Sequence, residues 1–183
     1  GWNPGVGRIT SIAINPIDTN IIYVASPGGG IWKSSNAGKN WVPLTDFNGL
    51  WMNMYSVTID PNNVNTVYAG SNANVIIKTT DGGATWVPIN FGMTGIIRKI
   101  LVDPANSNNV LVAAANGIWR STNGGGAWTR TYVGTMEDLD FKPGSSTILY
   151  AASTAVVLKS VDAGATWTTL GATNGIGTTG RSL

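Results

Sequence analysis

Apolar and polar positions alternate in four short segments spread along the chain: Ile9–Ile14, Met54–Ile59, Ile97–Val102 and Met136–Phe141. In each segment two apolar side chains are separated by a single residue, and a period of two predicts a β-strand. A dipeptide ending in proline follows each segment, and proline ends a strand and begins a turn. These dipeptides start eight residues before Tyr23, Tyr68, Leu111 and Tyr150.

Three more strands are predicted after each of these segments. The predicted second strands are Ile21–Ser26, Thr66–Ser71, Val110–Ala115 and Ile148–Ser153. The predicted third strands are Ile31–Ser34, Val75–Thr79, Gly117–Ser121 and Val156–Ser160. The predicted fourth strands are Trp41–Leu44, Trp86–Ile89, Trp128–Thr131 and Trp167–Leu170. No helical period accompanies them, so the sequence predicts an all-β protein.

One motif, Ser/Thr-x-Asp/Asn-x-Gly-x-x-Trp, recurs four times between the predicted third and fourth strands. Its members are Ser34, Asn36, Gly38 and Trp41; Thr79, Asp81, Gly83 and Trp86; Ser121, Asn123, Gly125 and Trp128; and Ser160, Asp162, Gly164 and Trp167. The tryptophans are 45, 42 and 39 residues apart, close to the ~40–45 residues of a four-stranded propeller blade. The sequence therefore predicts a β-propeller of four-stranded antiparallel blades, with about four blades present.

The motif has a structural explanation as a turn. Asp or Asn accepts hydrogen bonds from backbone N–H groups further along, glycine supplies a position with positive φ, and the tryptophan packs against a neighbouring strand or blade. Two turns carry Asn where the others carry Asp, an exchange that a calcium site would not tolerate because it gathers several carboxylates. We therefore expect no metal in these turns.

Composition narrows the classes of function. The net charge is only +2, with scattered Lys and Arg, so no nucleic-acid partner is expected. The chain has no His and no Cys, which removes the commonest general base and metal ligand. We expect no cofactor. No apolar stretch reaches the ~20 residues of a membrane span, so none is expected in this segment.

At the four turns the sequence resembles the Asp-box (BNR) propellers. This group includes sialidases, xyloglucan-degrading glycosidases, the sortilin (Vps10-like) luminal domains and a photosystem assembly factor. The resemblance implies that the turn is structural and lies at the outer edge of a blade, away from the face that binds ligands.

The opening stretch, GRITSIAINPIDTNIIYVASPGGGIWKSSNAGKNWVPLTD, resembles secreted propellers of Bacteroidetes-type bacteria. That resemblance implies export by the type IX secretion system. The stretch also resembles the first blade of xyloglucanase-type glycosidases, in which a catalytic Asp precedes the glycine pair before the third strand. Pro27 occupies that place here and cannot act as an acid, base or nucleophile. The Arg-Ile-Pro motif of sialidases is absent as well.

Two groups of residues are candidates for binding, and no residue is a candidate for catalysis. The segment Phe47–Tyr55 is rich in apolar side chains, and Phe47, Trp51 and Tyr55 could form an aromatic platform for a glycan or protein. Alternatively, the loop folds down between two blades. Arg98, Glu137 and Asp138 lie at the starts of predicted first strands, where the acidic pair could bind a cation or a basic group. Alternatively, they are a solvated strand start.

The predicted blades cover approximately residues 7–45, 52–90, 95–132 and 134–171 of one propeller segment, 1–183. Residues 172–183 resemble the start of another blade, because Gly180-Arg181-Ser182-Leu183 resembles Gly7-Arg8-Ile9-Thr10. We therefore expect the chain to belong to a larger propeller with six to eight blades, or to a double propeller.

These observations favour a non-catalytic, secreted or cell-surface module that binds or scaffolds a protein or glycan partner, with the secretion machinery as a further partner. The alternative is part of a xyloglucanase-like glycoside hydrolase whose catalytic carboxylates lie outside this segment. A third possibility is an assembly factor like the photosystem propeller, which would present an arginine patch. Arg8, Arg98 and Arg181 are its candidates.

Overall fold

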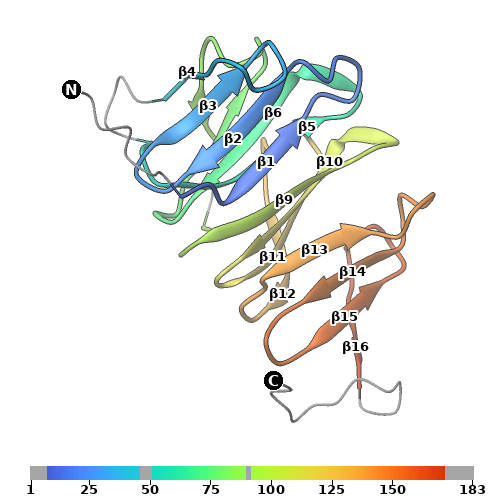
Figure 1. The fold of residues 1–183 in the computed structure, drawn as a ribbon. Helices are drawn as coiled ribbons and strands as arrows, with labels where there is room; N and C mark the ends of the chain where they lie inside the picture. Colours follow the sequence, from blue (N-terminus) through green and yellow to red (C-terminus); the bar gives the residue numbers. More distant parts are fainter. Residues whose placement is uncertain (1–7, 46–50, 90–91, 172–183) are drawn as a thin grey trace, which may run out of the picture.

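The structure is a computed structural model that describes residues 8–45, 51–89 and 92–171. These residues form sixteen strands and no helix (Figure 1). The strands build four four-stranded antiparallel sheets, and within each sheet they follow one another in chain order. The all-β fold and the propeller blades predicted from the alternation and the repeat are thereby confirmed.

The four sheets have the same layout, from an inner to an outer strand. The inner strands are β1 (Ser11–Ile14), β5 (Met54–Asp60), β9 (Ile97–Asp103) and β13 (Asp138–Phe141). The second strands are β2 (Ile22–Ser26), β6 (Asn63–Ser71), β10 (Asn106–Ala114) and β14 (Leu149–Ala152). The third strands are β3 (Gly30–Ser34), β7 (Ile76–Thr79), β11 (Gly117–Ser121) and β15 (Val157–Ser160). The outer strands are β4 (Val42–Pro43), β8 (Val87–Pro88), β12 (Thr129–Val133) and β16 (Thr168–Leu170).

Several strand boundaries differ from the sequence prediction. Each outer strand begins one residue after the motif tryptophan, and the side chains of Trp86, Trp128 and Trp167 pack toward the preceding sheet. Trp128 Nε1, for example, donates to the Ile89 carbonyl oxygen at 2.8 Å. The strands β6 and β10 begin earlier than predicted, because the two-residue turn at Pro61 lets Asp60 pair with Asn63, and the third sheet repeats this turn.

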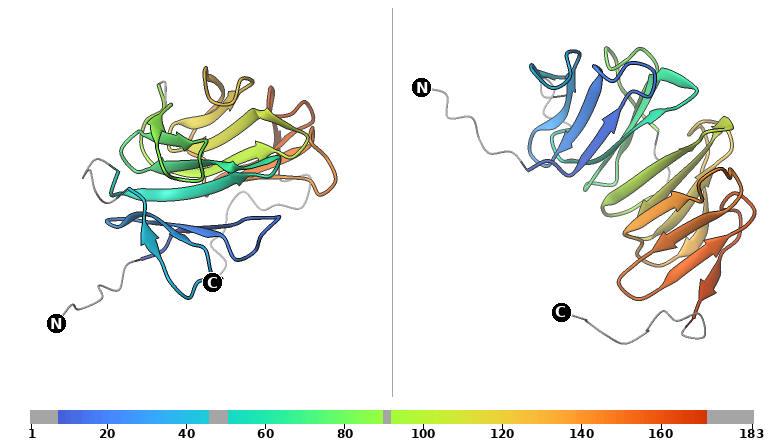
Figure 2. Two further views of the ribbon diagram at one scale, coloured as in Figure 1. Left: turned by 90° about the horizontal axis from the view of Figure 1, so that it is seen from above. Right: turned by 45° about the vertical axis from the view of Figure 1, so that its right-hand side comes forward.

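The four sheets stack face to face in an arc, with the first and last sheets at its two ends (Figures 1 and 2). The inner strands β1, β5, β9 and β13 contact one another in succession. One cluster of buried apolar residues fills each of the three spaces between neighbouring sheets. The core is therefore three layers between sheets rather than one centre.

A middle sheet buries both of its faces. In β6, Val67 and Ala69 join the cluster shared with the first sheet, whereas Tyr68, between them, joins the cluster shared with the third sheet. Successive side chains of a strand point to opposite faces. A sheet that is apolar on both faces is stable only with a neighbour on each side.

A polar contact joins each sheet to the turn of the next. Tyr23 and Lys33 are cross-strand partners on β2 and β3, and the Tyr23 hydroxyl and Lys33 Nζ each donate to the Gly82 carbonyl oxygen at 2.9 Å. The Lys33 ammonium also lies 5.3 Å from the centre of the Tyr23 ring, within range of a cation–π contact. Gly82 belongs to the motif turn of the second sheet, so this inter-sheet joint links segments far apart in sequence.

The joint recurs between the second and third sheets. The Tyr68 hydroxyl and Lys78 Nζ donate to the Gly124 carbonyl oxygen at 3.2 and 2.9 Å. Burial, assisted by the charge of Asp60, raises the pKa of Tyr68 to about 12, so its hydroxyl remains a donor across the neutral range. In the third joint Arg120 Nε donates to the corresponding carbonyl, that of Ala163, at 2.9 Å.

The motif glycines allow the sheets to approach closely. Gly164 has φ +79, and a Cβ placed there would lie 2.1 Å from Leu111 Cδ2 of the preceding sheet. Gly38, at the same motif position in the first sheet, has a similar φ of +83, but its nearest neighbour would be Trp41 Cζ2 at 3.6 Å. The two positions share a backbone requirement and differ in packing.

We predict that Gly164→Ala destabilises the protein by about 2–4 kcal/mol, from the left-handed backbone and from overpacking against Leu111. Gly38→Ala should cost only about 1 kcal/mol, because it carries the backbone term alone. Urea unfolding of both variants measures the difference. Equal losses would contradict a role of the glycine in sheet-to-sheet packing.

Candidate functional site

The predicted binding residues gather on one face of the arc. Because each inner strand is followed by an antiparallel second strand, the starts of all four inner strands lie on the same face, together with the turns between second and third strands. We call it the strand-start face. The motif turns lie at the opposite ends of the strands. Trp51, Tyr55, Arg98, Glu137 and Asp138 therefore belong to a single face.

Tyr55, Arg98 and Glu137 occupy equivalent positions in three successive sheets, two residues before the buried Val57, Ile100 and Leu139. Tyr55 is the extra residue where the pairing of β5 with β6 shifts between Met54 and Ser56. Arg98 is the extra residue at the matching shift in β9. Such β-bulges re-aim a side chain and are frequent beside functional sites.

Two ion pairs join β9 to β13 on this face. Arg98 Nε lies 3.0 Å from Glu137 Oε2, and Lys99 Nζ lies 3.4 Å from Asp138 Oδ1. The N–H of Arg98 Nε forms no hydrogen bond in the described structure, so its contact with Glu137 is a close ion pair rather than a hydrogen bond. All four side chains are partly exposed, and such pairs contribute only about 0–1 kcal/mol to stability.

Sequence reasoning did not identify Lys99. Its position is equivalent to Ser11 and Ser56, and both serines bridge to the next sheet. Ser11 Oγ accepts from Val57 N at 3.1 Å, and Ser56 Oγ donates to the Ile97 carbonyl oxygen at 3.0 Å. Lys99 continues this row with an ion pair. The sequence could have indicated Lys99, because Lys99 follows Arg98 directly in a predicted first strand.

The aromatic segment is only partly accessible. Trp51 packs, half-buried, against the cluster between the first and second sheets, and its carbonyl oxygen accepts from Thr45 Oγ1 at 3.2 Å. Tyr55 is also half-buried, and Met54 is fully buried. Phe47 lies outside the described residues, as does the carboxylate Asp46.

A hollow of about 400 Å³ runs along the inner strands β1, β5 and β9. Its lining includes Ile12, Ile14, Thr58, Lys99 and Leu101. The volume falls in the range of small-molecule sites, about 300–1,000 Å³. Lys99 lines this hollow and also pairs with Asp138, so it connects the hollow to the two ion pairs at the strand-start face.

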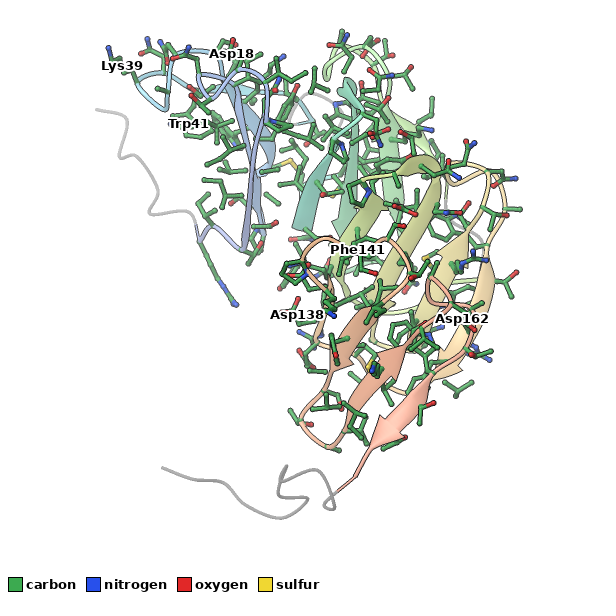
Figure 3. All side chains as sticks on the ribbon, turned by 90° about the vertical axis from the view of Figure 1, so that its right-hand side faces the viewer. Asp18, Lys39, Trp41, Asp138, Phe141 and Asp162 are labelled. Atoms are coloured by element: carbon green, nitrogen blue, oxygen red, sulfur yellow. The ribbon has the colours of Figure 1, made fainter. Side chains whose placement is uncertain are left out.

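The motif turns use their carboxylates for internal hydrogen bonds. Asp162 Oδ1 accepts from the Thr166 amide at 2.9 Å, and its Oδ2 accepts from the Thr166 hydroxyl at 2.6 Å. In the first turn Asn36 Oδ1 accepts from the Asn40 amide at 2.8 Å in the same way. Asp162 lies at the far side of its sheet from Asp138 (Figure 3).

Two further carboxylates are buried in the turns after inner strands. Asp60 Oδ1 accepts from the Asn62 amide at 2.9 Å, and Asp103 Oδ1 accepts from the Ala105 amide at 2.8 Å. Pro27, at the place of the xyloglucanase acid, forms an isolated β-bridge with Asn53. Within residues 8–45, 51–89 and 92–171 no group of three His, Cys, Asp or Glu side chains is placed to hold a metal.

The structure describes two of the three arginines expected to form a patch. Arg8 is exposed at the start of the described chain, Arg98 is paired with Glu137, and Arg181 lies outside the described residues. Among the described residues, no helix is both long and apolar enough to cross a membrane.

Comparison with known proteins shows which solved structures share this fold. No family model and no curated protein matches the sequence. An ancestral GH74 enzyme matches with a TM-score of 0.78 and 22% identity, over 91% of this chain and 24% of that enzyme. The GH74 enzyme of Niastella koreensis matches with a TM-score of 0.77 and 24% identity, over 89% of this chain and 29% of its own. The chain thus spans less than a third of these enzymes.

A propeller bound to a peptide is also similar. The structure of YCF48 bound to D1 peptide matches with a TM-score of 0.70 and 19% identity, over 91% of this chain and 54% of YCF48. At these identities the likeness shows the β-propeller fold, and the fold is shared by enzymes and by a peptide-binding protein.

We predict that stability falls as the pH is lowered from about 4 to about 2, in part through two motif turns. Hydrogen bonds from Thr166 hold the pKa of Asp162 at about 2, and bonds from Thr79 and Thr85 hold the pKa of Asp81 well below its ordinary value of 3.8. A carboxyl with a depressed folded-state pKa stabilises the fold above its unfolded pKa, and this stabilisation is lost as pH falls through the folded pKa.

The variant Asp81→Asn/Asp162→Asn should therefore lose less stability over this range than the unmodified chain. The amide oxygen of Asn36 already accepts the equivalent backbone bond in the first turn, so the turn itself should persist. Urea unfolding at pH 4 and pH 2 measures both proteins. An unchanged acid sensitivity would contradict the assignment of these two carboxylates.

Proposed function

We propose that this chain is a non-catalytic binding and scaffolding module of a secreted or cell-surface protein, and that its strand-start face recognises a protein or glycan partner. The observation that carries the proposal is the row of equivalent residues in neighbouring sheets. Tyr55 and Arg98 sit at matching bulges, and Arg98 pairs with Glu137 of the next sheet. Bulges that aim side chains from a rigid sheet suit recognition.

The side chains of this row favour a partner that carries polar groups together with a surface that can pack on an aromatic ring. Tyr55 offers a half-buried aromatic ring, Arg98 a planar donor, and Glu137 and Asp138 acceptors. Tyrosine and arginine are enriched at interaction hot spots. A partly exposed ion pair can exchange its internal partner for a charged group of the ligand at little cost, because the pair itself adds little stability.

Four carboxylates already accept hydrogen bonds within turns, and this supports the non-catalytic assignment. A glycosidase uses two carboxyl groups on either side of the scissile bond. Here Asp81 and Asp162 are held in turns with depressed pKa values, and Asp60 and Asp103 are buried in hydrogen bonds. The similarity to GH74 enzymes supports a second candidate, part of a xyloglucanase-like glycoside hydrolase whose catalytic carboxylates lie outside this segment.

The opening stretch resembles secreted propellers of Bacteroidetes-type bacteria. This resemblance is the basis for proposing a secreted or cell-surface location and the type IX secretion machinery as a further partner. The peptide-bound YCF48 structure is a precedent for a protein partner on this fold. The proposed blades remain those expected from the repeat, approximately 7–45, 52–90, 95–132 and 134–171, within a larger propeller.

We predict that the chain binds a glycan or an extended peptide without hydrolysing glycans. The immobilised full-length protein is tested for binding to xyloglucan, other β-glucans, a sialoside and a peptide library, while hydrolysis of the same glycans is followed in parallel. Turnover that disappears when a single carboxylate is neutralised would contradict the proposal and favour the hydrolase.

For the ligand identified in this way, Arg98→Glu and Glu137→Arg should each weaken binding at least tenfold, as expected for hot-spot residues. The double variant Arg98→Glu/Glu137→Arg restores an ion pair in the opposite orientation. It should recover stability but not binding. Lys142→Glu, an exposed charge beyond the end of β13, is the matched control and should leave affinity unchanged. Binding restored by the double variant would show that the pair is only structural.

A further inference from the structure

In the second and third sheets, the turn between the second and third strands is hydrogen-bonded to the loop that enters the same sheet. In the second sheet the Asn72 amide donates to the Asn53 carbonyl oxygen at 3.1 Å, and in the third sheet the Ala115 amide donates to the Ile96 carbonyl oxygen at 3.0 Å. The segments touch closely, because a Cβ added at Gly95 of the loop would lie 2.6 Å from Ala115 Cβ. Turn and loop therefore pack directly on each other at these two sheets.

The fourth sheet lacks this bond between turn and loop. Its turn is closed by its own hydrogen bonds: the Ser153 amide donates to the Val156 carbonyl oxygen at 2.9 Å, and Ser153 Oγ accepts from the Ala155 amide at 3.1 Å. The loop entering this sheet is bonded to the preceding sheet instead, because the Met136 amide donates to the Ala114 carbonyl oxygen at 3.2 Å. Turn and loop thus keep separate partners.

A pocket of about 210 Å³ lies between this turn and this loop, residues 153–156 and 134–136, which no hydrogen bond joins in the described structure. Tyr132, at the end of β12, completes the lining. Met136 is buried, whereas Tyr132 and Val156 are half-buried. We call this site the turn–loop pocket. It opens on the strand-start face between the third and fourth sheets, so adding sheets at either end of the arc would not place a sheet over it.

The size and lining of the pocket suit a single apolar side chain. Its volume is below the ~300–1,000 Å³ of sites that hold a whole small molecule. Met136 is flexible and adapts to different apolar shapes, and Tyr132 and Val156 add apolar contact. The hydroxyls of Ser153 and Thr135 already bond to backbone groups of the protein. The pocket therefore fits a Leu, Met or Phe side chain better than a sugar ring, which needs several free hydrogen-bonding groups.

The charges nearest to the pocket along the chain are acidic. No residue of the lining is charged, and Glu137 and Asp138 follow Met136 directly. In both ion pairs of this face the carboxylate is the more exposed member: Glu137 is 38% exposed against 31% for Arg98, and Asp138 is 66% exposed against 38% for Lys99. A partner that approaches this face therefore meets the two carboxylates first, and a basic group complements them.

We propose that the turn–loop pocket takes one apolar side chain of an extended segment of a partner protein, and that Glu137 and Asp138 pair with a Lys or Arg beside that side chain. This inference rests on the proposed function, because it names the partner of the strand-start face as a basic, apolar peptide segment rather than a glycan. The apolar side chain anchors the segment, as buried side chains do at interaction hot spots. The carboxylates select its charge.

Selection of peptides tests the chemistry of the partner. The immobilised full-length protein is used to select binders from a random library of short linear peptides. The selected peptides should carry Leu, Met or Phe within about two residues of Lys or Arg. Replacing the apolar residue with Ser, or the basic residue with Glu, should each weaken binding at least tenfold, as expected of an anchor and its neighbour. The peptide with the added Glu should regain affinity for the variant Glu137→Arg.

A matched pair of protein variants tests the pocket. Ala155→Phe places a ring at the rim of the pocket and should weaken binding of the selected peptides at least tenfold. Ala73→Phe is the control, because Ala73 has the same place in the turn of the second sheet: its amide donates to Ser71 Oγ at 3.0 Å, and both alanines are exposed. It should leave affinity unchanged. Circular dichroism checks that both variants are folded.

Two results would overturn the proposal: selected peptides that have no apolar residue in common, and equal binding by Ala155→Phe and the unmodified protein. If Arg98→Glu weakens binding while Ala155→Phe does not, the strand-start face still binds its partner and only the pocket is wrongly assigned. Binding of glycans without binding of any peptide would also reject the pocket alone. A full-length protein that binds neither peptides nor glycans would reject the proposed function together with the pocket.

Discussion

The structure depends on the contact between one sheet and the turn of the next. A Tyr–Lys pair on the second and third strands donates to a turn carbonyl of the following sheet, and a glycine beside that carbonyl removes the Cβ that would keep the sheets apart. Burial of apolar side chains supplies most of the driving force. The polar contact fixes the position at which two sheets meet, because the hydroxyl and the ammonium must both reach the same partly buried carbonyl oxygen.

This joint also determines where recognition can occur. Because the joint holds neighbouring sheets at matching positions, the starts of the inner strands form one face. Tyr55, Arg98 and Glu137 then occupy equivalent positions in successive sheets, and Arg98 pairs with Glu137 although the two come from different repeats. The scaffold repeats its backbone and varies its side chains at these positions. A propeller can acquire a new partner by changing this row while leaving the joints intact.

The repeat predicted the sheets because alternation and tryptophan spacing are local properties of the sequence. The bulges at Tyr55 and Arg98 could not be predicted, since they depend on how β5 and β9 pair with their partner strands. The acceptor of Tyr23 lies 59 residues further along, and only the fold brings Gly82 to it. Tyr23 and its equivalents were visible as a repeated landmark, but their hydrogen bonds were not.

The central claim is that a sheet of this protein is stabilised by a neighbour on each of its faces, and hydrogen exchange measured on the dilute monomer tests it most directly. The account predicts strong protection of amides in β6 and β10, whose sheets are covered on both sides, and weaker protection of the equivalent amides in β2 and β14. Equal protection in all four sheets would contradict it and would mean that each sheet is stable without its neighbours.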